Sequence, residues 1–196
     1  NLNPWVIPTM VTLTAQSDFT IDNFKNELFT FYVSVPGDRA DLKPVAALVL
    51  NYLMQMALSI DSKYPVTFLL DEFTNFGYIP GFAGRVSLVR KTGLSFCLGF
   101  QDIGQVINVY GRDEGPIILS QPGTRIFLRP NTLETSKYIS EQLGTTTLVE
   151  RNHGYAGQEQ IRRAPRRLML PDEVAKLPEE QAIVFTVKTS HGLLVN

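Results

Sequence analysis

The sequence contains almost none of the residues from which disulfide bonds and zinc sites are built. Cys97 is the single cysteine among 196 residues, so no disulfide can form within the chain. The two histidines, His153 and His191, have no cysteine at metal-ligand spacing, which argues against a zinc site. Stability must therefore come from an apolar core, and 44% of hydrophobic residues is enough to build one.

The chain also lacks an excess of charge of either sign. Its 18 lysines and arginines against 19 aspartates and glutamates give a net charge of −1. This balance excludes nucleic-acid binding through bulk charge, so any such contact would need a local basic patch. Charged residues make up only 19%, below the roughly 25% of typical domains. The deficit suggests that a partner or further polypeptide covers part of the surface.

Long hydrophobic runs are missing as well. The most apolar stretch, residues 44–60, is interrupted by Asn51 and Gln55 and falls short of the roughly 20 residues that a membrane span needs. No signal peptide opens the chain, and Asn1 stands where an initiator methionine would be. We therefore expect a fragment or a processed chain.

A phosphate-binding loop is not present in the sequence. Such a loop reads Gly-x-x-x-x-Gly-Lys-Ser/Thr, and no Gly-Lys dipeptide occurs anywhere in the chain. The backbone amides and the lysine that grip a triphosphate are therefore missing. On this ground we expect the chain alone to bind ATP weakly or not at all.

The patterns that are present alternate between strands and helices. Continuous apolar runs predict strands buried on both faces at Val66–Leu70 and 94–100, and a further short run predicts a third strand at 124–128. Each gap is long enough for a helical crossover, so the three are predicted to be neighbouring parallel strands of an open α/β sheet. The other expected elements are strands at 29–35 and 183–187 and helices at 44–60, 81–91, 102–110 and 132–143.

Two carboxylates directly follow the first buried strand. Asp71 and Glu72 are expected at the carboxyl edge of the sheet, where α/β proteins bind ligands. An aspartate there can hold Mg²⁺ through water, and an adjacent acid can orient or deprotonate an attacking water. The alternative is that the pair only ends a strand and caps the next element. Asp172-Glu173, by contrast, follows a proline and has the pattern of a helix N-terminus.

Polar and basic residues provide further candidates. Gln101 directly follows the strand at 94–100, where it could sense a γ-phosphate or a water, or be an ordinary loop residue. Arg90 precedes the same strand and could contact phosphate or be a solvated cation at a helix C-terminus. A basic stretch further on could contact a phosphate backbone, or be a solvated loop or a strand at a subunit interface. Its arginines are Arg151, Arg162, Arg163, Arg166 and Arg167.

The order of these motifs resembles that of the type IV secretion coupling proteins, the TraG/TraD-like conjugative ATPases. The matching pieces are Leu-Leu-Asp-Glu-Phe at 69–73, a Gly-x-x-Pro-x-Phe turn at 77–82 and a strand that ends in Gln101. The resemblance continues through TRIFL at 124–128, TSKYISEQLG at 135–144 and RRLMLPDEV at 166–174, and covers about residues 20–190. The combined order is specific, although no single piece is.

The resemblance implies a RecA-like α/β domain of the P-loop NTPase type, with a mainly parallel sheet flanked by helices. The sheet would be incomplete, because the Walker A half is absent from this chain. Residues 1–24 would be a lead-in from the end of an all-α insertion, and residues 25–196 would be the C-terminal part of the nucleotide-binding motor domain.

Roles for individual residues also follow from the resemblance. Asp71 and Glu72 match the Walker B pair, so Asp71 would hold Mg²⁺-ATP through water and Glu72 would be catalytic. Gln101 matches a sensor glutamine, and Arg90 resembles an arginine finger. Arg125 matches a family arginine and joins the basic stretch as a candidate for nucleic-acid or interface contacts. ATP and Mg²⁺ are expected in the complete protein, and neither is expected to bind this chain tightly.

For the whole protein, the resemblance implies an ATP-driven homo-hexameric motor at the cytoplasmic face of the bacterial inner membrane, anchored by a segment outside this soluble chain. Its partners would be secretion-channel components and either a relaxase–DNA complex, with single-stranded DNA, or effector proteins. Two alternatives stay open: a non-catalytic scaffold or substrate-receptor module on the same fold, and another RecA-like DNA translocase. A Gly-Lys-Ser/Thr motif upstream of Asn1 would favour the motor over the scaffold.

Overall fold

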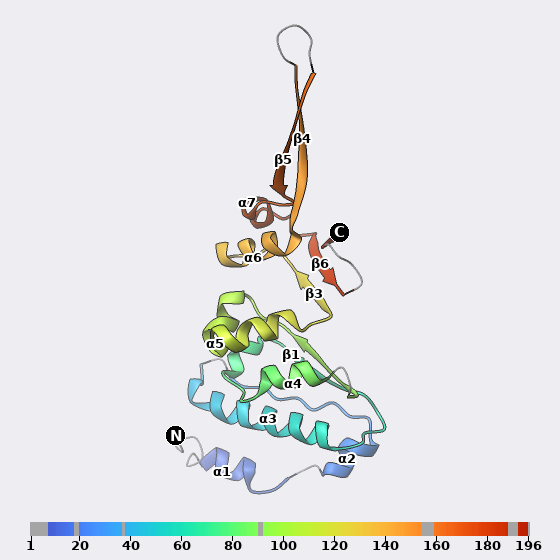
Figure 1. Cartoon of the computed structure of the whole chain (residues 1–196). Coiled ribbons are helices and arrows are strands. Elements are labelled where there is room, and N and C mark those ends of the chain that lie inside the picture. Colours follow the sequence, from blue (N-terminus) through green and yellow to red (C-terminus); the bar gives the residue numbers. More distant parts are fainter. Residues whose placement is uncertain are drawn as a thin grey trace. The chain divides into compact units, whose positions relative to one another are not determined.

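The computed structural model describes residues 8–17, 20–36, 38–89, 92–153, 159–187 and 192–195. They fall into two compact units, and Figure 1 labels most of their helices and strands. The first unit comprises Asn1–Phe100 and Gln105–Gln121, and the second comprises Gln101–Gly104 and Pro122–Asn196. The predicted division into a lead-in and a motor domain stays a prediction.

Helices make up most of the first unit, and two strands lie among them. The helices predicted at 44–60, 81–91 and 102–110 are all observed, and a second helical segment reaches Ser120 after a kink at Gly111, whose φ of 73° and ψ of −177° are not helical. In chain order the elements are α1 (Pro8–Thr14), α2 (Ile21–Asn26), η2 (Ala40–Leu42), α3 (Lys43–Ser59), β1 (Val66–Leu70), η3 (Phe73–Phe76), α4 (Phe82–Leu88), β2 (Leu94–Leu98) and α5 (Ile103–Ser120).

The long helix α3 contributes much of the first unit's core. Pro44 lies in its first turn, where a missing backbone N–H breaks no helical hydrogen bond. Its inner side buries residues such as Leu50 and Met54, whereas Tyr52 is exposed. By length and composition alone, Ala40–Ser59 could cross a membrane, and 44% of its most apolar window is buried in the fold. Because a core helix meets the same criterion, this stretch is weak evidence for a membrane span.

The two strands of the first unit are parallel, as predicted. Val66 lies opposite Leu94 and Leu70 opposite Leu98. The prediction that both strands are buried on both faces is wrong, because Leu69 and Cys97 lie on a face that is open to solvent. The other face carries Phe68, whose ring packs against Phe96 with ring centroids 5.3 Å apart and planes tilted by 30°. The pair therefore packs on one side only within this unit.

The predicted strand at 29–35 is not a strand in the structure. Residues 27–36 have no helix or strand assignment, and Glu27–Val33 lie along β1 and α3, where they line a cavity of about 470 Å³. Phe31 and Tyr32 are both exposed, by 42% and 88%. Two consecutive side chains point to opposite faces of a strand, and here both are exposed, so neither face would be buried. The apolar run alone was therefore a misleading signal for a strand.

The second unit combines a small antiparallel sheet, two helices and a hairpin. The sheet has the order β3-β6-β7, and β3 pairs antiparallel with β6. The strand predicted at 183–187 and the helix predicted at 132–143 are both observed. The elements are β3 (Thr124–Phe127), α6 (Leu133–Leu143), β4 (Thr145–His153), β5 (Glu159–Arg167), α7 (Pro171–Ala175), β6 (Ala182–Thr186) and β7 (Leu193–Val195).

The prediction that 124–128 is a parallel neighbour of the first two strands is therefore wrong. Among the described strands, β1 and β2 form the one parallel pair. Pairing with β6 is favoured because it places Ile183 and Phe185 in a core against α6 and α7, with Phe127 packed beside them. The remaining residues of that core are Ile139, Leu143, Val174 and Leu177.

A long hairpin of β4 and β5 follows α6. Gly144, which ends α6, has φ of 78°, a left-handed conformation that glycine adopts without strain. The nine-residue strands pair antiparallel from Thr145 opposite Arg167 to His153 opposite Glu159. Figure 1 shows the hairpin extending away from α6 and α7 of its own unit. The described part of the basic stretch therefore lies on strands, and a subunit interface along them stays a prediction.

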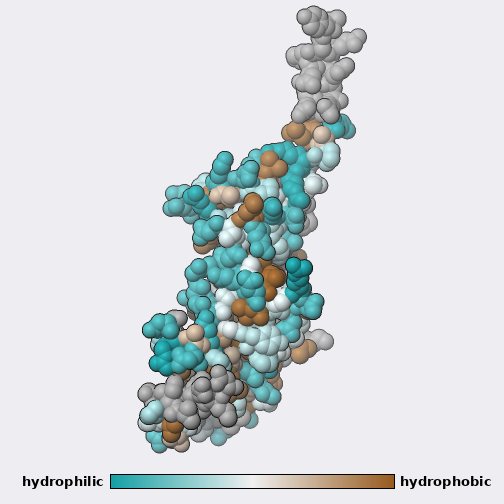
Figure 2. All heavy atoms as spheres, turned by 90° about the vertical axis from the view of Figure 1, so that its left-hand side faces the viewer, coloured by the Kyte–Doolittle hydropathy of each residue, from teal (hydrophilic) through white to brown (hydrophobic). Residues whose placement is uncertain are grey.

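Apolar side chains remain on the surface of both units. Leu69 in the first unit is 73% exposed, and Leu128 in the second is 68% exposed. Figure 2 shows brown apolar patches among the hydrophilic residues of the face in view. These exposed apolar side chains are consistent with the low share of charged residues in the sequence.

Candidate active site

The Asp71-Glu72 pair lies where the parallel strands end. Gly99 after β2 donates its N–H to the carbonyl of Leu70 at 2.9 Å, and Phe73 donates its N–H to the carbonyl of Gly99 at 2.8 Å. These two bonds hold the chain on either side of the carboxylates against the end of β2. The pair is therefore at the carboxyl edge of the strands, as the sequence indicates.

Glu72 has an unusual backbone conformation. Its φ of 48° and ψ of 50° are left-handed, and it is the single non-glycine residue with positive φ in the described part of the chain. The next residue, Phe73, is fully buried, and its ring stacks on Tyr110 and packs against Phe82. The fixed Phe73 thus supports a strained Glu72, and such strain clusters at functional sites.

Gly99 is a member of this site that the sequence analysis missed. A Cβ at this position would lie 3.3 Å from Oδ1 of Asp71 and 3.7 Å from the backbone nitrogen of Glu72. The absence of a side chain therefore lets the carboxylate approach the end of β2 closely. The only sequence signal was a glycine directly after an apolar strand.

Two other predicted site residues are less fully described. Gln101 lies three residues beyond the end of β2 and is grouped with the second unit, so its proximity to Asp71 stays a prediction. Arg90 lies outside the described residues. The catalytic roles of both residues stay predictions.

Asp102, next to Gln101, is the centre of a polar cluster. Its Oδ1 accepts the N–H of Gly104 at 2.6 Å, which confirms the expected cap of α5. Its Oδ2 accepts the hydroxyls of Thr132 and Thr135, the latter at 3.0 Å. Partial burial raises the pKa of Asp102, but these hydrogen bonds outweigh it and lower the pKa overall. The contacts to α6 were not foreseen, because the residues are about thirty positions apart.

Arg125 is engaged within the second unit. Its guanidinium donates to the hydroxyl of Tyr138 at 3.1 Å and to Oε1 of Gln142 at 3.3 Å. It also lies over the ring of Phe185, 5.1 Å from the centroid. These contacts give it a role in packing the sheet against α6.

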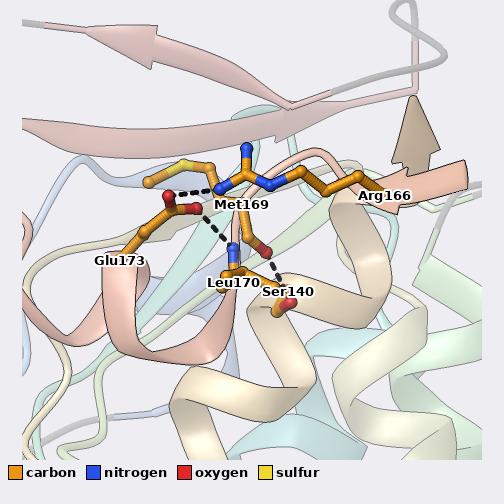
Figure 3. Close-up of polar contacts among 5 residues, drawn as sticks. All are labelled: Ser140, Arg166, Met169, Leu170 and Glu173. Carbon is orange, nitrogen blue, oxygen red and sulfur yellow. Dashed lines mark hydrogen bonds and ion pairs between the residues drawn. The ribbon is translucent and has the colours of Figure 1, made fainter. Parts of the chain in front are cut away.

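Two arginines of the basic stretch bind carboxylates at the base of the hairpin. Arg166 donates to Glu173 at 2.6 Å, and the other oxygen of that carboxylate accepts the N–H of Leu170 at 2.7 Å (Figure 3). The hydrogen bonds from Leu170 and Arg166 lower the pKa of Glu173. Arg167 donates to Glu141 at 3.5 Å. Asp172 and Glu173 thus lie in the first turn of α7, as predicted, and Glu173 accepts the N–H of the N-cap residue Leu170.

The remaining basic residues are less constrained. Arg163 is exposed on β5. The side chains of Arg151 and Arg162 lie outside the described residues, although their backbones pair with Ile161 and Glu150. A nucleic-acid or interface contact through this stretch therefore stays a prediction.

The carboxylates fit a magnesium ion for which a nucleotide supplies further ligands. Within the described ranges, no group of three or more His, Cys, Asp or Glu side chains could hold a metal ion by itself. Mg²⁺ is commonly bound by one or two carboxylates together with substrate phosphates and water. Asp71, exposed at the end of β1, offers the oxygen donor that such an arrangement needs.

Comparison with known proteins agrees with the family resemblance found in the sequence. A family model described as "Type IV secretory system Conjugative DNA transfer" matches residues 1–192. Protein VirD4 of Rhizobium rhizogenes is 27% identical over 94% of this chain and 29% of that protein. The conjugal transfer protein TraG of Escherichia coli is 25% identical over 87% of this chain and 31% of that protein. The chain thus spans less than a third of either relative.

Solved structures support the fold. The unbound bacterial conjugative coupling protein TrwBdeltaN70 matches with a TM-score of 0.68 and 21% identity, over 81% of this chain and 38% of that chain. The plasmid coupling protein TrwB in complex with ADP and Mg²⁺ matches with a TM-score of 0.57 and 23% identity, over 74% of this chain and 35% of that chain. The RecA-like α/β fold is thereby confirmed.

Proposed function

Because this chain belongs to the type IV secretory system conjugative DNA transfer family, we propose that it is the C-terminal part of a coupling-protein motor domain that hydrolyses ATP. The observation that carries this proposal is the Asp71-Glu72 pair at the carboxyl edge of two parallel strands. The strain at Glu72 and the close approach at Gly99 support an active site rather than a simple strand end.

In the proposed reaction, each residue acts on the phosphates or on the attacking water. Asp71 would hold the Mg²⁺ of Mg²⁺-ATP through water, and the ion would neutralise charge on the phosphates. Glu72 orients the attacking water and accepts its proton, and Gln101 contacts the γ-phosphate or the same water. Arg90 supplies positive charge to a nucleotide held by a neighbouring subunit. A phosphate-binding loop from polypeptide outside this chain completes the site.

At the level of the whole protein, the proposal is a homo-hexamer at the cytoplasmic face of the bacterial inner membrane, anchored by a segment outside this chain. It delivers a relaxase–DNA complex, including single-stranded DNA, or effector proteins to secretion-channel components. The names of the relatives, which include conjugal transfer and plasmid coupling proteins, support this assignment.

Glu72→Gln in the complete polypeptide tests the hydrolysis step. We expect the variant to bind ATP almost as well as the parent but to lose hydrolysis, because a water-orienting acid acts mainly in the transition state. Asp71→Asn should also weaken Mg²⁺-dependent binding. Steady-state rates and nucleotide titrations measure both effects.

Asp172→Asn is the matched control, because Asp172 is an acid in the first turn of α7. It should hydrolyse ATP at the parental rate. If Glu72→Gln hydrolyses ATP within about twofold of the parent, the catalytic assignment is wrong, and the non-catalytic scaffold becomes the better explanation.

A further inference from the structure

The Asp102 cluster ties the residue after Gln101 to a second helix. One carboxylate lies at the N-terminus of α5, through Gly104, and at the N-terminus of α6, through Thr132 and Thr135. Thr135 also accepts the N–H of Ile103 at 3.4 Å. A negative charge is favoured at a helix N-terminus, and here the start of α6 is held to the same carboxylate that caps α5.

The cluster is packed too tightly to shift freely. Thr135 is only 6% exposed, and Ser136 beside it is fully buried. A Cβ at Gly104 would lie 2.8 Å from Oδ1 of Asp102 and 3.0 Å from Glu134, so a side chain there would displace these carboxylates. Because consecutive Cα atoms are about 3.8 Å apart, holding Asp102 in place also limits how far the backbone of Gln101 can move.

We propose that Asp102 is a positioning residue for ATP hydrolysis, which fixes Gln101 to the N-terminus of α6 through the hydroxyls of Thr132 and Thr135. A helix cap alone would need only the Gly104 contact, whereas the structure adds two donors from another element. The segment Gln101–Gly104 accordingly groups with the second unit although β2 belongs to the first. This inference rests on the proposed function, because it assigns Gln101 a contact with phosphate or water.

Thr135→Val in the complete polypeptide tests the proposal. Valine keeps the shape of threonine but removes the hydroxyl that donates to Asp102, and it leaves the Thr132 cap in place. Misplacing a reacting group by about 1 Å can cost about a hundredfold in rate. We therefore expect kcat to fall about ten- to a hundredfold while the KM for ATP stays within about twofold.

Two variants separate positioning from stability. Thr135→Ser keeps the hydroxyl and should retain a kcat near the parental value. Ser136→Ala removes a buried hydroxyl from the same turn of α6, one that donates to the carbonyl of Thr132 at 2.8 Å and not to Asp102. It should leave kcat unchanged, whatever its effect on Tm. Equal losses of kcat in Thr135→Val and Ser136→Ala would overturn the proposal.

Combining Thr135→Val with Gln101→Ala gives a second test. The kcat of the double variant distinguishes an effect through Gln101 from a general loss of structure. If Asp102 acts through Gln101, Thr135→Val should lower kcat no further once Gln101→Ala is present. If the losses of kcat from Thr135→Val and Gln101→Ala add up in the double variant, Asp102 does not act through Gln101. Parental hydrolysis by Glu72→Gln would overturn the proposed function and this inference together. Blocked hydrolysis by Glu72→Gln with a parental kcat for Thr135→Val would overturn this inference alone.

Discussion

Single residues show where the backbone is under constraint. Glu72 keeps a left-handed conformation next to a fully buried Phe73. A side chain in that conformation costs roughly 1–2 kcal/mol relative to the right-handed region, a cost that glycine avoids. The constraint therefore predicts a stability difference that is independent of any reaction.

Glu72→Gly should be more stable than Glu72→Ala by about 1 kcal/mol, because alanine retains the left-handed strain. Urea unfolding of this chain measures the difference. Asp71 is the matched control, because its φ is not positive. There the alanine variant should be at least as stable as the glycine variant. The same ranking at both positions would contradict the strain assigned to Glu72.

Asp102 predicts a pH dependence. Its pKa is lowered in the folded chain, so the carboxylate contributes stability above the unfolded pKa of about 3.9. That contribution is lost as the pH falls through the folded pKa. The parent should therefore exceed Asp102→Asn in stability by more at pH 7 than at pH 3, as measured by urea unfolding. A difference that grows on acidification would refute the assignment.

At the residue scale, the sequence predicted positions better than contacts. Asp71 and Glu72 were recognisable because an apolar strand precedes them directly. The cluster of Asp102 with Thr132 and Thr135 was not, because it joins residues about thirty positions apart. Gly99 gave no distinct signal, since its importance lies in what a Cβ would contact.

Elements in the second unit are joined by buried polar contacts. Ser140 of α6 is fully buried and donates its hydroxyl to the carbonyl of Met169 at 2.6 Å, close to the pair of Arg166 and Glu173 (Figure 3). Leu168 donates its N–H to the carbonyl of Gly144 at 3.0 Å. These bonds fix the base of the hairpin to α6.

Ser140→Ala should therefore destabilise the chain by about 1–2 kcal/mol, because it leaves the carbonyl of Met169 without this donor. Ser136→Ala is the matched control on the same helix, since the carbonyl of Thr132 keeps the backbone N–H of Ser136. Both changes alter helix propensity equally. Denaturant unfolding should show a larger loss for Ser140→Ala, and equal losses would contradict an inter-element role.

Most elements were predictable, but their pairing was not. Apolar runs and caps located α3, α6 and the strands β1 and β2, because these features are local. The partner of β3 depends on the core built by β6, which no local pattern shows. The hairpin was hidden because its strands carry Thr and Arg residues exposed on both faces, with no alternation of hydrophobicity.

At the scale of the whole molecule, the chain contains two units and no phosphate-binding loop. Asp71, the proposed Mg²⁺-holding carboxylate, offers no cradle of backbone N–H groups for the triphosphate. The chain by itself is therefore expected to bind ATP·Mg²⁺ weakly or not at all. Calorimetric titration checks this, and a sub-micromolar affinity would show that the triphosphate binds elsewhere in this chain.

One residue of the hairpin bears on how the protein behaves at high concentration. Pro165, opposite Thr147, has no backbone N–H and is exposed. Proline is accommodated in a sheet where its nitrogen points away from the partner strand, so the outer edge of β5 lacks one donor. A strand from another molecule that docked along that edge would lose a ladder bond at this point. Pro165 therefore protects a long exposed hairpin against edge-to-edge aggregation.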